Sequence, residues 1–136
     1  PEILARLKGR KHLILGNHDD VSDLRVKQQF VEIVQMKKLT DSSNGENRKV
    51  LLTHCPYMMW EGQHTGTIML YGHLHDTIDE FLFQKYLREY NKARPPKQER
   101  KEVYCMAYSV CQCLWGYEPV TLDEVLSGSD SGQSFR

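Results

Sequence analysis

The sequence predicts an α/β protein, because short apolar runs typical of buried strands alternate with segments of helical periodicity. Three of the apolar runs lead into histidine-bearing segments, at residues 16–19 (GNHD), 53–56 (THCP) and 72–75 (GHLH). In open α/β sheets, functional sites form beyond the carboxyl ends of the strands. We therefore expect these three segments to converge in space.

The elements of the first half follow from hydrophobic spacing and turn signals. Residues 2–8 have apolar side chains at helical spacing before Gly9, which predicts the last turns of a helix. Residues 12–15 predict a buried strand, and residues 20–30 predict a helix that Asp20 or Ser22 caps. A strand is expected over residues 31–36. The polar stretch 40–47 then indicates a turn before the next strand, at 49–53.

The second half opens with an irregular stretch, 56–66, that is rich in aromatic residues and methionine. Residues 67–71 predict a strand, and 79–93 predict an amphipathic helix that Arg94-Pro95-Pro96 ends. Residues 103–114 are strand-like, and 122–126 predict a short helix with Thr121 as its N-cap. The Gly/Ser-rich tail, 127–136, is expected to be disordered.

Composition narrows the class of protein. The 136 residues suffice for one domain or part of one, and 26% of them are charged, so we expect a soluble protein. The 18 basic and 18 acidic residues cancel, which removes the electrostatic case for binding nucleic acid or a membrane surface. No apolar run approaches the roughly 20 residues of a membrane span, and no segment of the 136 residues has the pattern of a signal peptide, although a region before Pro1 could have carried one. The four cysteines form no C-x-x-C pair, which favours reduced thiols and a cytoplasmic location.

The three histidine segments hold the ligand types that a borderline divalent metal prefers, an amide oxygen at Asn17 and imidazoles at His54, His73 and His75. His73 and His75 are two residues apart, so they can serve two neighbouring ions, and Gly72 before them lets the backbone approach closely. Each residue alone has a simpler interpretation: a turn or cap for Asn17, a half-buried histidine for His54, and loop histidines for the pair. Together they favour a metal site.

Residues 15–19 (LGNHD), 52–56 (LTHCP) and 70–75 (LYGHLH), in this order and each after a strand, resemble the motifs of the calcineurin-like metallophosphoesterases. Residues 115–120 (WGYEPV) are similar to the G-Y-x-P-V ending of small bacterial and phage members, and the resemblance covers about residues 7–126. It implies a four-layer αββα sandwich. It also implies hydrolysis of a phosphate mono- or diester by a hydroxide that two divalent ions activate.

The resemblance also implies metal ligands. Asn17, His54 and His73 match ligands of one ion, and His75 matches a ligand of the second. Ligands of this kind accept Mn, Fe, Zn or Ni, so the identity of the two ions stays open.

His18 matches the histidine that contacts the phosphate and protonates the leaving group, with Asp19 placed to orient or tune it. His64 lies in the irregular stretch and is a second candidate to contact substrate, although an exposed loop histidine is the simpler interpretation.

The chain departs from the family at its start. Family members begin with a D-x-H motif and a G-D motif, and neither occurs before Gly16. We therefore expect residues 1–126 to be the C-terminal part of one domain whose N-terminal strands and helices belong to a longer parent, with this chain inactive alone. The expected partner is a phosphate-ester substrate and not a membrane. The sequence leaves nucleic acid open as a substrate, although the balanced charge gives no support for it. The sequence does not determine the oligomeric state.

Two other functions compete. One is a non-catalytic metal- or partner-binding module on the same fold. The other is a structural metal site made by Cys105, Cys111 and Cys113, although small buried core residues are the favoured interpretation of these cysteines. Cys55 beside His54 is expected to pack near the metal site and not to act as a nucleophile.

Overall fold

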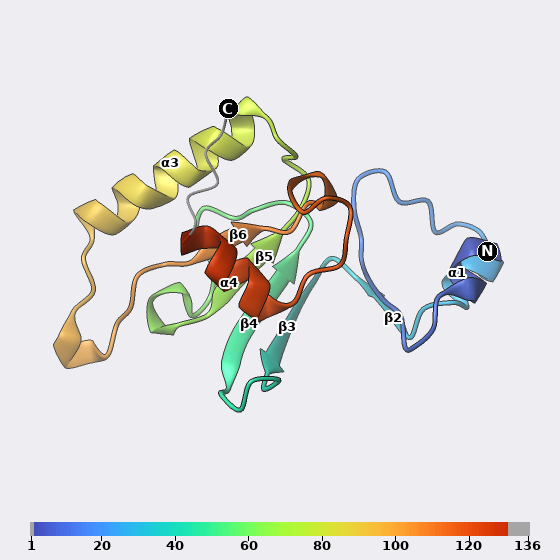
Figure 1. Ribbon diagram of the computed structural model, residues 1–136, viewed down its shortest axis with the longest axis horizontal. Coiled ribbons are helices and arrows are strands. Elements are labelled where there is room, and N and C mark those ends of the chain that lie inside the picture. The colour runs from blue at the N-terminus through green and yellow to red at the C-terminus, as the bar shows by residue number, and fades with distance from the viewer. Residues whose placement is uncertain (1, 131–136) are drawn as a thin grey trace.

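The computed structural model describes residues 2–130 and has a mixed α/β architecture, which confirms the predicted class (Figure 1). The first half contains α1 (Glu2–Arg6), β1 (His12–Ile14), α2 (Leu24–Lys27), β2 (Glu32–Val34), β3 (Met36–Asp41) and β4 (Arg48–Thr53). The second half contains η1 (Gln63–Thr65), β5 (Ile68–Tyr71), α3 (Ile78–Ala93), η2 (Gln98–Arg100), β6 (Ala107–Ser109), η3 (Gln112–Leu114) and α4 (Leu122–Asp130).

The larger sheet has four strands in the order β3-β4-β5-β6. β3 is antiparallel to β4, whereas β4, β5 and β6 are parallel to one another, so their carboxyl ends meet at one edge. The register pairs Leu51 with Met69 and Met69 with Ala107, and all three belong to the buried core. Leu87 of α3 packs into the same cluster, so this helix covers one face of the sheet. Figure 1 shows α4 lying across the sheet away from α3.

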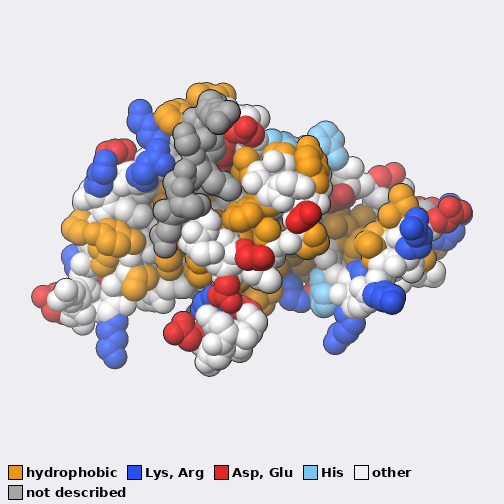
Figure 2. Space-filling model, in the orientation of Figure 1, with side chains coloured by type: hydrophobic (Ala, Val, Ile, Leu, Met, Phe, Trp, Pro, Cys, Tyr) orange, Lys and Arg blue, Asp and Glu red, His pale blue; other side chains and the backbone are white. Residues whose placement is uncertain are grey.

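The smaller sheet pairs β1 and β2 in parallel. None of residues 2–35, which contain β1 and β2, is fully buried, so this part of the chain has no core of its own among the described residues. Large apolar side chains are exposed there, namely Ile3, Leu7, Leu24 and Val31. Figure 2 shows hydrophobic side chains reaching the surface on this side of the molecule. The smaller sheet therefore depends on its contacts with the larger one.

Two of the elements predicted in this region, one helix and one strand, were wrong in their extent. The helix expected over residues 20–30 is reduced to α2, because Asp20 accepts a bond from the Ser22 amide and holds a turn, and Asp23 is the N-cap in place of Asp20 or Ser22. The single strand expected over 31–36 is two strands, and β3 continues to Asp41 within the expected turn. Arg48 faces Asp41 across the sheet and forms an ion pair with it, which extends the ladder.

The last third also differs from expectation. Within residues 103–114, only the three residues of β6 form a strand. The Cys105 amide and carbonyl form hydrogen bonds with the side chain of Asn91 on α3, so they are not available to a neighbouring strand. Cys111 is the N-cap of η3 and Cys113 lies within it, so neither cysteine is on a strand. α4 runs to Asp130, so residues 127–130 are helical where a disordered tail was expected, and residues 131–136 lie outside the described part. Within residues 2–130, no helix has the length and apolar character needed to cross a bilayer.

Candidate metal centre

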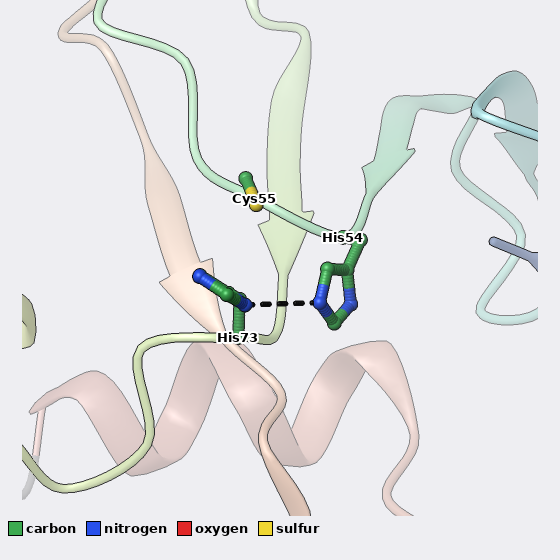
Figure 3. Close-up of side chains that lie close together, drawn as sticks. All are labelled: His54, Cys55 and His73. Atoms are coloured by element: carbon green, nitrogen blue, oxygen red, sulfur yellow. Dashed lines mark hydrogen bonds between the residues drawn. The ribbon is translucent and has the colours of Figure 1, made fainter. Parts of the chain in front are cut away.

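Three side chains from three strand ends meet at the edge between the two sheets. Asn17 lies in the loop after β1, His54 directly follows β4, and His73 follows β5. The Nε2 atom of His54 lies 2.7 Å from Asn17 Oδ1 and 3.0 Å from His73 Nδ1, and the last two atoms are 3.1 Å apart. Figure 3 shows the contact between the two imidazoles. The sequence-predicted ligands of one ion therefore converge on one point.

The close approach of the β1 loop to β4 requires Gly16. A Cβ at this position would lie 2.9 Å from His54 Cε1 and 3.1 Å from an oxygen of Asp19. A Cβ at Gly72 would meet only the His54 carbonyl, at an ordinary 3.9 Å. The close backbone approach that the sequence suggested for Gly72 thus occurs at Gly16.

His73 and His75 both adopt left-handed backbone conformations, with φ of 65° and 53°. Such conformations are uncommon for residues other than glycine and concentrate at functional sites. They direct the two imidazoles to different neighbours: His73 contacts His54, whereas His75 Nδ1 contacts the Sγ atom of Cys111. The G-H-x-H segment therefore serves two separate clusters of potential ligands.

The environment keeps His54 neutral at neutral pH. Partial burial lowers the pKa of His54, and the neighbouring His73 lowers it further when it is protonated. A neutral ring leaves a lone pair on nitrogen, which is the form that binds metals. Cys55 lies on the same loop, and its sulfur is within 4.8 Å of the ligand atoms of His54 and His73 (Figure 3). This side chain is exposed, as expected for a residue that borders the site.

His18 and Asp19 follow Asn17 directly and lie at the rim of the site. Asp19 Oδ2 accepts a hydrogen bond of 2.7 Å from the Gly16 amide, which closes the loop into a tight turn. His18 is exposed, and its ring makes no hydrogen bond within residues 2–130. Asp19 thus holds the turn that contains His18, and among the described residues it makes no direct bond to the His18 ring.

His64, the other residue expected near substrate, is not brought to the site. It lies on η1 at the amino end of β5, whereas His73 follows the carboxyl end of the same strand. Its Nδ1 atom lies 2.7 Å from an Arg94 nitrogen and 3.3 Å from Cys105 Sγ. Cys105 is thus separated from Cys111 and Cys113, and the three cysteines do not make one cluster.

Comparisons with protein-family models, with curated proteins and with solved structures return no match. Any proposal about function therefore rests on the sequence motifs and on the geometry of the site. Sequence reasoning missed the grouping of His75 with Cys111 and Cys113. One signal could have found it. The C-x-C segment of Cys111 and Cys113 follows β6, and β6 pairs in parallel with β5, the strand that precedes His75.

Proposed function

We propose that this protein is a metal-dependent phosphoesterase that hydrolyses a phosphate mono- or diester. The observation that supports it is the triangle of Asn17, His54 and His73 ligand atoms, with sides of 2.7 to 3.1 Å, beside an exposed His18. The three contacts have hydrogen-bond lengths, but one ring N–H cannot serve both an amide oxygen and a second imidazole with good geometry. A divalent ion bound to all three would account for the arrangement.

The ligand types leave the ion open among Mn, Fe, Zn and Ni. The sides of 2.7, 3.0 and 3.1 Å are hydrogen-bond lengths, and they are also close to the roughly 3.0 Å that separates neighbouring ligand atoms of a six-coordinate ion. A six-coordinate ion such as Mn(II) would therefore fit with little movement of the three side chains, and Mn(II) serves as the probe ion.

The roles of the chain's own residues follow from their positions. Bound divalent ions would polarise the phosphoryl oxygens and increase the acidity of the attacking water. Asp19 holds the turn that presents His18, and the exposed His18 ring can reach a phosphate and donate a proton to the leaving oxygen. An imidazole suits this donation because its ordinary pKa lies near neutrality.

In this proposal the chain supplies only part of a two-ion site within an αββα sandwich. Asp19 is the nearest acidic side chain in the sequence to these ligands, and its carboxylate is bonded to the Gly16 amide. The bridging carboxylates of a two-ion site would then have to come from outside residues 2–130. Monoesters and diesters, including nucleic acid ends, remain candidate substrates.

The test measures metal and hydrolysis separately. In the parent protein with Mn(II), His18→Ala should lower hydrolysis of an activated aryl phosphate about 100-fold or more, with the bound Mn(II) unchanged. His12→Ala removes an exposed histidine of β1 and should leave hydrolysis unchanged. Loss of Mn(II) from the His18 variant, or full activity of that variant, would contradict the assignment.

A non-catalytic metal-binding module is the second candidate. The neutral ligand set at Asn17, His54 and His73 favours it, because this set alone binds an ion without the carboxylates of a two-ion site. Under this alternative the parent protein binds Mn(II), hydrolyses neither aryl monoesters nor aryl diesters, and His18→Ala changes nothing that is measured.

A further inference from the structure

A second group of potential ligands lies beside the first. The Nδ1 atom of His75 is 3.3 Å from Cys111 Sγ and 3.8 Å from Cys113 Sγ, and the two sulfurs are 3.5 Å apart. Cys111 is buried, Cys113 is half-buried and His75 is exposed, so the group opens to solvent on one side.

The fold brings these residues together through two neighbouring strand ends. His75 lies in the loop after β5, and both cysteines lie in the segment after β6, which pairs with β5 in parallel. On an extended strand, residues two apart are separated by about 6.7 Å. The tight turn of η3, which begins after Cys111, brings the two sulfurs to about half that separation.

The separations match those of a bound ion. Zinc lies about 2.3 Å from thiolate sulfur and about 2.0 Å from imidazole nitrogen, so tetrahedral angles place neighbouring ligand atoms about 3.5 to 3.8 Å apart. The three observed separations, 3.3, 3.5 and 3.8 Å, average close to this range. They are longer than the sides of the Asn17 triangle, as larger sulfur ligands require.

We propose that His75, Cys111 and Cys113 form a thiolate–imidazole metal site that prefers Zn(II) to Mn(II). Two thiolates and one imidazole make a soft ligand set, and the fourth tetrahedral position faces solvent at the exposed His75 side. The protein then has two chemically different sites, one for a six-coordinate ion at Asn17, His54 and His73, and one for zinc.

Core packing and a disulfide both fit the geometry less well than a metal site. Packing of small cysteines in a core does not require an imidazole nitrogen that faces both sulfurs, and His75 adopts an uncommon backbone conformation to provide it. A disulfide needs sulfurs about 2.05 Å apart, whereas the sulfurs of Cys111 and Cys113 are 3.5 Å apart and both thiols are free.

The two proposals can fail separately, because the proposed function is argued from Asn17, His54, His73 and His18, and binding of zinc at His75 does not require that any ester is hydrolysed. The readout is therefore metal binding and not activity. A thiolate signature without hydrolysis in the parent protein would uphold this site and contradict the phosphoesterase. Hydrolysis without a thiolate signature would do the reverse.

The first experiment titrates the full chain with Co(II) under reducing conditions and follows the thiolate-to-cobalt charge-transfer absorption in the near ultraviolet. Wild-type protein should develop this band, and Cys111→Ser/Cys113→Ser should lose it together with about one bound ion per chain. Cys55→Ser and Cys105→Ser are matched controls and should keep the band. A band that depends on Cys55 or Cys105, or no band in the wild type, would overturn the proposal.

A second measurement needs no variant and so does not depend on how the variants fold. Zn(II) should slow the reaction of Cys111 and Cys113 with a thiol reagent about tenfold or more, as read by peptide mass spectrometry, whereas Mn(II) at the same concentration should not. Cys105 is the internal control, because its thiol lies beside His64 and outside both proposed metal sites. Equal protection by the two ions, or none by zinc, would overturn the proposal.

Discussion

Gly16 and Gly72 each precede a histidine motif, yet only Gly16 contacts a ligand side chain. A Cβ at Gly16 would press on the His54 ring and the Asp19 carboxylate, whereas one at Gly72 has ordinary room. At the scale of single residues, the position of the His54 ring thus depends on the absence of a side chain at Gly16, in the loop after β1.

We predict that Gly16→Ala weakens Mn(II) binding about 10- to 100-fold, because His54 must move away from Asn17 and His73. Gly72→Ala is the matched control and should change affinity by less than about twofold, since φ at Gly72 is not positive. Isothermal titration calorimetry measures both. A similar loss in the two variants would contradict the steric role of Gly16.

Glu80 is a second residue with a distinct environment. It is 2% exposed, its Oε1 accepts a hydrogen bond of 2.7 Å from the Tyr71 hydroxyl, and its Oε2 has no partner among the described residues. Burial raises the pKa of Glu80 above its ordinary value of 4.5, despite the bond from Tyr71. The folded protein therefore binds this proton more tightly than the unfolded chain.

Stability from the Glu80 proton is fully present below the unfolded pKa of 4.5 and is lost as pH rises through the higher folded pKa. We predict that Glu80→Gln, which resembles the protonated side chain, gains stability over the wild type as pH rises from about 4 to about 8. Urea unfolding over that pH range measures it. Parallel pH profiles for the exposed control Glu89→Gln and for Glu80→Gln would contradict the assignment.

At the scale of elements, α4 begins with a capping box. The Glu124 amide donates to Thr121 Oγ1 at 3.3 Å, and Glu124 Oε2 accepts from the Thr121 amide at 2.6 Å. The helix places buried Val125 against the sheet, and Arg48 pairs with Asp123 in its first turn. The N-terminus of α4 therefore holds in place the C-terminal end of the segment that follows Cys111 and Cys113.

We predict that Thr121→Ala lowers the free energy of unfolding by about 1 kcal/mol, because the first-turn amide of Glu124 loses its partner. Thr121→Ser keeps the hydroxyl and should cost less than about half of this amount. Denaturant unfolding followed by circular dichroism measures both variants. Equal losses would indicate that the threonine methyl group, and not the cap, stabilises α4.

At the scale of the whole molecule, the two sheets differ in how firmly they are held. The larger sheet contains the buried core, whereas none of residues 2–35, which contain the smaller sheet, is fully buried. Contacts of Asn17 with His54 and His73 join the smaller sheet to the larger one. A bound ion at this point would therefore connect the two halves of the molecule.

We predict that backbone amides of β1 and β2 exchange with solvent faster than those of β4 and β5 when no metal is bound. Mn(II) at about 100 times its dissociation constant should slow exchange in β1 and β2 up to about 100-fold, because it binds only the joined state. Asn17→Ala should remove this protection. Hydrogen–deuterium exchange mass spectrometry measures it, and protection that persists in the variant would contradict the role of Asn17.

Local sequence patterns were sufficient where neighbouring residues decide the outcome. The strands at 12–14, 48–53 and 68–71 and the long helix of residues 78–93 follow from hydrophobic spacing, and the cap at Thr121 follows from its neighbour Glu124. Patterns failed where distant partners compete. Asn91 takes the backbone bonds of Cys105, and Arg48 extends β3 into the expected turn through Asp41.

The sequence by itself predicted that the segments holding Asn17, His54 and His73 would converge, since strand ends in an α/β chain meet at one edge of the sheet. The grouping of these three side chains as ligands of one ion came from the family resemblance. Only the tertiary structure decided that His75 turns away to Cys111 and Cys113, and that His64 lies at the other end of β5. Both outcomes depend on backbone turns and on packing between segments far apart in the chain, which periodicity and spacing do not encode.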